Sequence, residues 1–255
     1  IGITKKIKSN AIKEIFSQTL SHEVRRPLDK FEMILSRAPN LGSSEELKEY
    51  IKESNVIEDI STARELLKNV LDLNSNSQAK LYKTLTDIKD VFKKLLPNYS
   101  PFVSSNFEHS SLVLIDKPKI KRMFEIILDN AFEAIKKTSS SNNPRIKVLT
   151  KESTKSISIY VYNSGSKISK HNIFQIFDLF QSFGKSNGRG IGLTIAQKIA
   201  QSHGIKLRVE SNGYDIKGYS SNIVKTIPLE LEHNDDDDYV LFWCKFPTKV
   251  GETNG

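Results

Sequence analysis

The sequence contains a single cysteine and has no long hydrophobic run. One cysteine, Cys244, excludes an internal disulfide framework and fits a reducing compartment. No stretch approaches the roughly 18 consecutive apolar residues that a membrane-spanning helix requires, so no membrane segment is predicted in this chain. Most of the histidines also lack cysteine, histidine or carboxylate partners at metal-ligand spacing, and no structural metal is predicted for His109, His171, His203 and His233.

The 255 residues, of which 38% are hydrophobic, suffice for one large domain or two ordinary domains with real cores. The formal net charge of +8 would suit an anionic ligand or nucleic acid. The lysines are scattered, however, and no basic stripe alternates with aromatic residues as single-strand binding requires. We therefore expect no nucleic-acid binding and interpret the lysines as a solvated surface.

The first part of the chain has the periodicity of two long helices. Between residues 5 and 37, apolar residues recur every three or four positions: Ile12, Phe16, Leu20, Val24, Leu28, Phe31 and Leu35. After a break at 39–42, a second helix is expected from Glu46 to about Leu73, with a buried side made of Leu47, Ile51, Ile57, Ile60, Leu67 and Val70. Such a hairpin cannot bury its stripe alone, so residues 5–73 are expected to form a four-helix bundle with a second copy. Periodicity leaves a simple structural coiled coil open.

The polar run Asn74–Ser77 marks the expected boundary between domains 1–76 and 77–255. Beyond it, we expect helices at 84–96, 116–137 and 191–202, and strands at 102–107, 112–115, 145–151, 156–162, 205–210, 223–231 and 239–246. Asp116 should cap the second of these helices. The strands at 145–151 and 156–162 should pair in antiparallel fashion. Helices that are segregated from a mostly antiparallel sheet indicate an α+β two-layer sandwich.

One histidine stands on the first helix, in the segment Ser21-His22-Glu23-Val24-Arg25-Arg26-Pro27-Leu28. His22 falls beside the apolar stripe, where a side chain in a bundle reaches solvent. The Glu23 carboxylate can hydrogen-bond one imidazole nitrogen, which leaves the other nitrogen nucleophilic. Pro27 removes the amide that would bond the Glu23 carbonyl, so the helix can bend there. A lone helical histidine is ordinarily a surface or core residue, but these neighbours make His22 a candidate nucleophile.

The helix after Asp116 has two different faces. One is apolar and carries Phe124, Ile127, Leu128, Ala131 and Ile135. The opposite face carries Ile126, Asn130, Glu133 and Lys137. An asparagine amide oxygen is a hard ligand that suits Mg²⁺ bridging phosphates. A polar solvent-facing surface is the ordinary alternative interpretation of this second face.

Two glycine motifs follow. Asn163-Ser164-Gly165-Ser166-Lys167-Ile168 comes directly after a strand, where glycine lets a ligand approach the backbone. Gly188-Arg189-Gly190-Ile191-Gly192-Leu193-Thr194 opens a helix, whose N-terminus can present amides to phosphate. The spacing excludes a dinucleotide fingerprint and a P-loop. Between the motifs, the segment 176–185 has the composition of a mobile lid, with phenylalanine anchors and with Lys185 placed for a terminal phosphate.

In order and spacing, these motifs resemble the catalytic core of bacterial sensor histidine kinases over nearly the whole chain. Residues 16–28 resemble the H-box, 124–135 the N-box, 163–168 and 188–193 the glycine boxes, and 176–180 the F-box. The resemblance implies a dimerisation and phosphotransfer hairpin over 1–76 and a Bergerat-type ATP-binding sandwich over 77–255. It also implies ATP and Mg²⁺ as cofactors and a response-regulator receiver domain as partner. Because the chain begins at Ile1 without an initiator Met, we expect a fragment of a longer protein. The resemblance implies a cytoplasmic location, and a missing N-terminal region could tether the chain to the inner membrane.

Carried over residue by residue, the resemblance implies that His22 accepts the γ-phosphate and that Glu23 is its general base. Asn130 would hold Mg²⁺. The nucleotide site would contain Asn130, Glu133, Lys137, Asn163, Gly165, Lys185, Gly188, Gly190, Gly192 and Leu193. Catalysis would consist chiefly of positioning and charge neutralisation, as phosphoryl transfer generally requires.

Three positions depart from the family pattern. Asn163 stands where the family usually has Asp, which removes a charge-assisted hydrogen bond to adenine worth roughly 1 kcal/mol. Ile126 stands where another Asn is frequent, and Arg26 where many relatives have a Thr or Asn linked to phosphatase activity. Related chaperone- or topoisomerase-type ATPases have Glu at the place of Ile126, and an aliphatic side chain cannot activate water. A nucleotide-binding scaffold with weak or no kinase activity is a further alternative.

Overall fold

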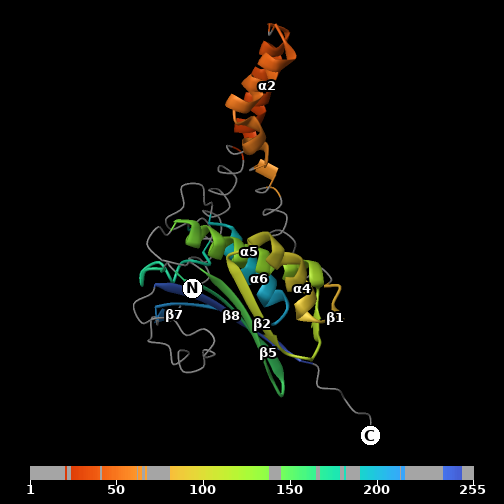
Figure 1. The fold of residues 1–255 in the computed structure, drawn as a ribbon, viewed down its shortest axis with the longest axis vertical. Helices are drawn as coiled ribbons and strands as arrows, with labels where there is room; N and C mark the ends of the chain where they lie inside the picture. The colour runs from red at the N-terminus through yellow and green to blue at the C-terminus, as the bar shows by residue number, and fades with distance from the viewer. Residues whose placement is uncertain are drawn as a thin grey trace, which may run out of the picture. The chain divides into compact units, whose positions relative to one another are not determined.

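A computed structural model of the chain divides into two compact units, Ile1–Asn76 and Ser77–Gly255 (Figure 1). The structure describes residues 21, 24–40, 42–61, 63–64, 67, 81–137, 145–164, 167–178, 181, 190–212, 214–215 and 238–248. His22 and Glu23, the strand expected at 223–231 and most of the predicted lid lie outside these residues.

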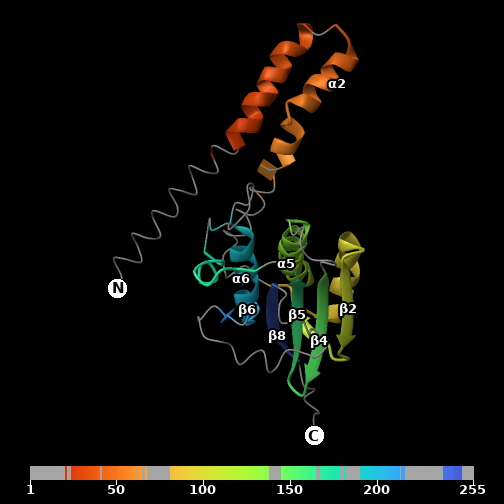
Figure 2. The ribbon, with the colours of Figure 1, turned by 60° about the vertical axis from the view of Figure 1, so that its left-hand side comes forward.

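The first unit contains two helical stretches that lie side by side (Figure 2). Residues 24–37 are helical, and the 3-10 turn η1 (Ala38–Asn40) and the helix α2 (Ser44–Glu53) follow. The Ser43 hydroxyl caps α2 by accepting a hydrogen bond from the Glu46 amide at 3.2 Å. A turn at 54–55, where Asn55 has a φ of 54°, separates α2 from a further helical segment at 56–61. The prediction of one uninterrupted helix from Glu46 to Leu73 is therefore wrong.

Polar and apolar contacts join the two stretches. Lys30 Nζ donates to the Ser54 carbonyl at 2.9 Å and forms an ion pair with Asp59, while Arg26 Nε lies 3.7 Å from Asp59 Oδ2. Within the described part of this unit, the buried side chains are those of Pro27, Ile34, Val56 and Ala63. Of the side chains predicted to be buried on the second helix, three are exposed by 68%, 46% and 43%: Ile57, Ile60 and Leu67. Their exposure in a single hairpin fits the expectation that a stripe this long is buried only by pairing with a second copy.

The second unit is a two-layer sandwich, with helices on one face of a sheet (Figure 2). The sheet order is β2-β4-β5-β8-β6-β7. In that order, the strands span Val103–Glu108, Ile146–Ser153, Ser156–Ser164, Tyr239–Pro247, Leu207–Ser211 and Tyr214–Asp215. All pairs are antiparallel except β2 with β4. The helices are α4 (Ile88–Leu95), extended by the turn η2 (Leu96–Tyr99), α5 (Lys117–Lys137) and α6 (Gly192–Ser202). The predicted α+β two-layer sandwich is thus confirmed.

A separate two-stranded sheet pairs β1 (Thr84–Thr86) with β3 (Val113–Ile115). The helix predicted from residue 84 is therefore wrong over its first turn. It begins instead at Ile88, because the Asp87 side chain accepts a hydrogen bond from the Lys89 amide at 2.8 Å and caps the helix there. The β-branched residues of Thr84–Thr86 favour the strand.

Helix α5 carries much of the core. Asp116 caps it as predicted, since its Oδ1 accepts a hydrogen bond from the Lys119 amide at 3.3 Å. All residues of the predicted apolar face are buried: Phe124, Ile127, Leu128, Ala131 and Ile135. The Phe124 ring lies 4.6 Å from the ring of Phe92 on α4 and 6.2 Å from that of Phe246 on β8. Each fully buried ring of this kind stabilises the fold by roughly 1.5–3 kcal/mol.

The buried imidazole of His203 joins the end of α6 to the start of α5. Its Nδ1 donates to the Ile199 carbonyl at 2.8 Å, and its Nε2 accepts a hydrogen bond from the Asp116 amide at 3.1 Å. Burial lowers the pKa of His203, because desolvation disfavours the cation. A proton on Nε2 would also face the Asp116 N–H. His203 is therefore a neutral residue that joins α5 and α6.

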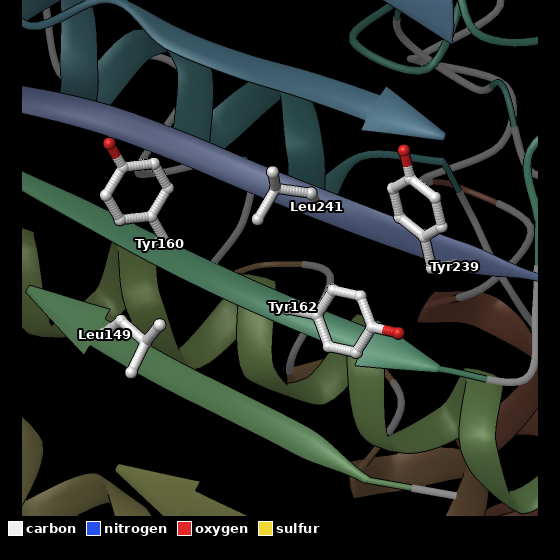
Figure 3. Close-up of a cluster of buried hydrophobic side chains, with 5 residues drawn as sticks. All are labelled: Leu149, Tyr160, Tyr162, Tyr239 and Leu241. Atoms are coloured by element: carbon white, nitrogen blue, oxygen red, sulfur yellow. The ribbon is translucent and has the colours of Figure 1, made fainter. Parts of the chain in front are cut away.

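The sheet face opposite the helices carries an aromatic cluster (Figure 3), which consists of Leu149, Tyr160, Tyr162, Tyr239 and Leu241. The rings of Tyr162 and Tyr239 stack with centroids 5.8 Å apart. Successive residues of a strand point to opposite faces of a sheet. Since Tyr160 and Tyr162 belong to the cluster, Val161 and Asn163 of β5 point towards the helices.

Candidate functional site

The end of β5, the middle of α5 and the start of α6 supply the predicted site residues that the structure describes. Helix α5 contacts both β5 and α6. On β5, Asn163 is paired with Ile146 of β4 and with Val240 of β8, and it is 2% exposed. Its backbone is held on both sides by neighbouring strands.

Asn130 lies on α5 and is half-buried. Its Nδ2 donates to the Ile126 carbonyl one turn earlier, at 2.8 Å. This bond sets the orientation of the amide, whose oxygen is a hard ligand of the kind that Mg²⁺ prefers. Glu133 follows on the helix and is exposed. Lys137 ends α5, and its side chain lies outside the described part of the chain.

Ile126 does not belong to a solvent face as the helical pattern had indicated. It is 5% exposed, because the start of α6 lies against it. A Cβ added to Gly192 would lie 3.2 Å from Ile126 Cγ2. At the position where the family resemblance implies a polar side chain, this chain therefore has a packing contact between α5 and α6.

Gly190 is required by both its backbone conformation and its surroundings. Its φ is +63°, in the left-handed region, and an added Cβ would lie 2.4 Å from the backbone nitrogen of Gln181. The backbone of residue 190 thus touches that of residue 181. This contact brings together the two ends of the glycine-rich segment between the F-box and α6.

The first turn of α6 has the features of an anion-binding helix end. Ile191 at its N-cap provides no side-chain hydrogen bond, and the first turn contains no acidic residue. The Thr194 hydroxyl donates to the Phe177 carbonyl at 2.9 Å and so links α6 to the F-box. Phe177 itself is buried. Leu193 is half-buried.

Several predicted site residues lie outside the described residues: His22, Glu23, Gly165, Lys185 and Gly188. Conversely, sequence reasoning missed Ser211, which bonds the amide of Ile168 immediately after the first glycine motif. The two residues are 43 positions apart, and no local pattern around a lone serine indicates such a contact.

Comparisons with known proteins agree with this geometry. Residues 115–231 match the family described as "Histidine kinase-, DNA gyrase B-, and HSP90-like ATPase". The sensor histidine kinase WalK of Bacillus subtilis is 23% identical over 252 residues, covering 92% of this chain and 40% of WalK. The histidine-protein kinase ArlS of Staphylococcus aureus is 29% identical over 211 residues, covering 77% of this chain and 45% of ArlS. The chain thus spans less than half the length of these relatives.

Solved structures show the same fold. The Acinetobacter baumannii histidine kinase AdeS superposes with a TM-score of 0.58 at 16% identity, covering 89% of this chain and 98% of that one. The histidine kinase ThkA, solved in complex with the response regulator protein TrrA, superposes with a TM-score of 0.61 at 20% identity, covering 96% of this chain and 64% of that one.

The fold and the family match define residues 115–231 as part of an ATPase domain with the Bergerat-type sandwich. Together with the two kinase relatives, they support the assignment of the chain as a sensor histidine kinase catalytic core. Among the described residues, no helix has the length and apolarity needed to cross a membrane.

Proposed function

We propose that this chain transfers the γ-phosphate of ATP to His22 and then to an aspartate of a response-regulator receiver domain. The observation that carries the proposal is a set of three features within a match to an ATPase family. Asn163 lies at the end of β5, Asn130 lies on α5, and the Gly190–Gly192 segment leads into α6. The complex of ThkA with TrrA supports a receiver domain as partner. Because ATP and receiver domains are cytoplasmic, we also place the chain in the cytoplasm, with any membrane tether supplied by a region outside it.

The proposed nucleotide site uses polar groups on the helical face of the sheet. The Asn163 carbonyl would accept a hydrogen bond from the adenine amino group, and the Asn130 oxygen would be a ligand of Mg²⁺. Mg²⁺ bound there would neutralise charge on the phosphates. The α6 N-terminus would add backbone amides, and Gly192 has no side chain that would cover them. Glu133 and Lys137 on α5, with Gly165, Lys185, Gly188 and Leu193, complete the proposed site.

The proposed acceptor is on the first helix. Ser21 immediately before His22 is helical and exposed, whereas Val24 is half-buried. An acceptor beside an exposed position could meet ATP and later a receiver domain. Glu23 would accept the proton from one imidazole nitrogen as the other nitrogen of His22 attacks the γ-phosphorus, while the bond to the bridging oxygen of the β-phosphate breaks and ADP leaves.

Incubation with γ-labelled ATP and Mg²⁺ tests the proposal. We expect label on the chain that is lost in acid and stable in base, as a phosphoramidate bond requires, and that moves to an added receiver domain. Asn130→Ala is expected to lower the labelling rate about a hundredfold or more, because it removes a proposed metal ligand. An unlabelled wild-type protein that still binds ATP would favour the scaffold alternative.

We also propose that residues 5–73 form a homodimeric four-helix bundle. The hairpin leaves a series of large apolar side chains exposed within one chain: Leu28, Phe31, Met33, Leu35, Ile57, Ile60 and Leu67. Exposure of so many apolar groups on one short hairpin marks an association surface. Packing against the same surface of a second copy would bury them.

Light scattering at micromolar concentration should give twice the chain mass of 28.9 kDa. The double variant Leu28→Asp/Leu35→Asp is expected to be monomeric, because it places charges in the proposed interface. Leu112→Asp is the matched control, since Leu112 is an exposed leucine of the second unit. A wild-type monomer, or a dimer that survives the double variant, would argue against this surface.

A further inference from the structure

The loop of the first glycine motif is held at both of its ends. At its start, the Arg145 amide donates to Ser164 Oγ at 3.0 Å, and the Ser164 amide donates to the Arg145 carbonyl at 3.1 Å. At its end, the Ile168 amide donates to Ser211 Oγ at 2.9 Å. The loop of the proposed nucleotide site is therefore attached to β4 on one side and to β6 on the other.

Ser211 connects this loop to a third strand. Its side chain is completely buried, and its hydroxyl donates to the Tyr239 carbonyl on β8 at 2.9 Å. One hydroxyl group thus satisfies a backbone donor and a backbone acceptor that belong to different segments. Without it, both would lack this partner, at a position where water does not reach Ser211.

Asn212 and Asp238 hold the same three segments around Ser211. Asn212 Oδ1 accepts a hydrogen bond from the Tyr239 amide at 2.9 Å, and Asn212 Nδ2 donates to Asp238 Oδ1 at 2.7 Å. Lys167, next to Ile168, donates to the same Asp238 oxygen at 3.2 Å. Two independent bonds therefore tie the end of the loop to the β6 and β8 strand ends.

The Tyr239 end of this connection is itself fixed by the sheet face away from the helices. Its ring stacks on that of Tyr162 (Figure 3), and its hydroxyl donates to Glu210 Oε1 at 2.8 Å. Tyr239 pairs with Ser164, the first residue of the loop, in the β5–β8 register. Tyr239 therefore belongs to the aromatic cluster and also contacts Ser211, which bonds the end of the glycine loop.

We propose that Ser211 is a positioning residue for nucleotide binding, because it holds Ile168 at the end of the first glycine motif. The inference rests on the proposed function, in which this loop lines the nucleotide site. Positioning of a binding loop before the ligand arrives raises affinity by removing the cost of ordering the loop. Ser211 itself is buried and does not contact the ligand.

Ser211→Ala tests this role in the full chain. We expect the Kd for a non-hydrolysable ATP analogue with Mg²⁺ to rise about tenfold, since the Ile168 amide and the Tyr239 carbonyl both lose this partner. The KM for ATP in labelling should rise by a similar factor, while the rate at saturating ATP changes by less than about twofold. The matched control is Ser156→Ala. Ser156 is also buried, and its hydroxyl bonds Ser153 Oγ at 2.8 Å. It stands at the other end of β5, about 26 Å from the loop along the strand.

Two further measurements keep the test decisive. In the wild type, the Ile168 amide should be protected from hydrogen exchange, whereas a fast-exchanging Ile168 amide would overturn the role whatever the variant does. Asn212→Gly, which suits the φ of 47° at this position and removes the side-chain bonds, should also raise Kd.

Equal Kd values for the wild type and Ser211→Ala, or an equal rise in Ser156→Ala, would overturn the role while ATP binding stands. A wild-type chain that binds no nucleotide would instead overturn the proposed function and this inference with it.

Discussion

Replacement of His22 by glutamine is expected to abolish phosphoryl transfer to the chain and to leave ATP binding unchanged. Glutamine is close to histidine in size and polarity, but the lone pair of its amide nitrogen is delocalised and is not nucleophilic. Removal of a covalent nucleophile that acts together with its base costs at least about a thousandfold in rate. The labelling rate with γ-labelled ATP, measured beside the Kd for the non-hydrolysable analogue, separates the two effects.

His171→Gln is the control for this substitution. His171 is an exposed histidine in the second unit, so its loss should change neither labelling nor binding. Label that persists in His22→Gln at the wild-type rate would place the acceptor elsewhere. If His171→Gln lost the label, the acceptor would lie in the second unit.

Gly190→Ala is expected to destabilise the second unit by about 2–5 kcal/mol and to prevent ATP binding. A left-handed backbone costs a non-glycine residue roughly 1–2 kcal/mol. The larger contribution is steric, because the new Cβ would lie 2.4 Å from the backbone nitrogen of Gln181. A backbone atom cannot move aside as a flexible side chain can, so the chain must shift at the start of α6. Urea unfolding and analogue binding measure the two consequences.

Gly204→Ala separates strain from collision. Gly204 has a similar φ of +70°, but an added Cβ there meets nothing within 4 Å. We therefore expect a loss of only about 1–2 kcal/mol and an unchanged Kd. Equal losses of stability in the two variants would show that the contact between residues 181 and 190 is unimportant.

Local sequence patterns determined the elements whose signals lie within a few residues. The Asp116 cap and the apolar spacing of α5 define that helix, and every residue of the predicted apolar face is buried, although Ile126, expected on the opposite face, is buried as well. The alternation in β4 and β5 predicted their antiparallel pairing, because a short turn joins them. The same local information placed Asn163 at a strand end and Asn130 on a helix.

Other features depend on contacts between distant residues. Thr84–Thr86 forms a strand because it pairs with Val113–Ile115, and the pairing of β2 with β4 is parallel because α5 lies between them in the chain. The helical pattern after α2 did not indicate the left-handed backbone at Asn55. That residue lies in the turn between α2 and the helical segment at 56–61.

For the site, the sequence by itself identified the motifs, their order and the residue types that suit a nucleotide and a phosphorylated histidine. The tertiary structure decided what surrounds them. Ile126 became a packing contact because Gly192 lies against it, and Ser211 became part of the loop support because β6 ends beside Ile168. Residue types and local spacing are properties of the chain, whereas these contacts exist only after strands and helices far apart in the sequence have packed together.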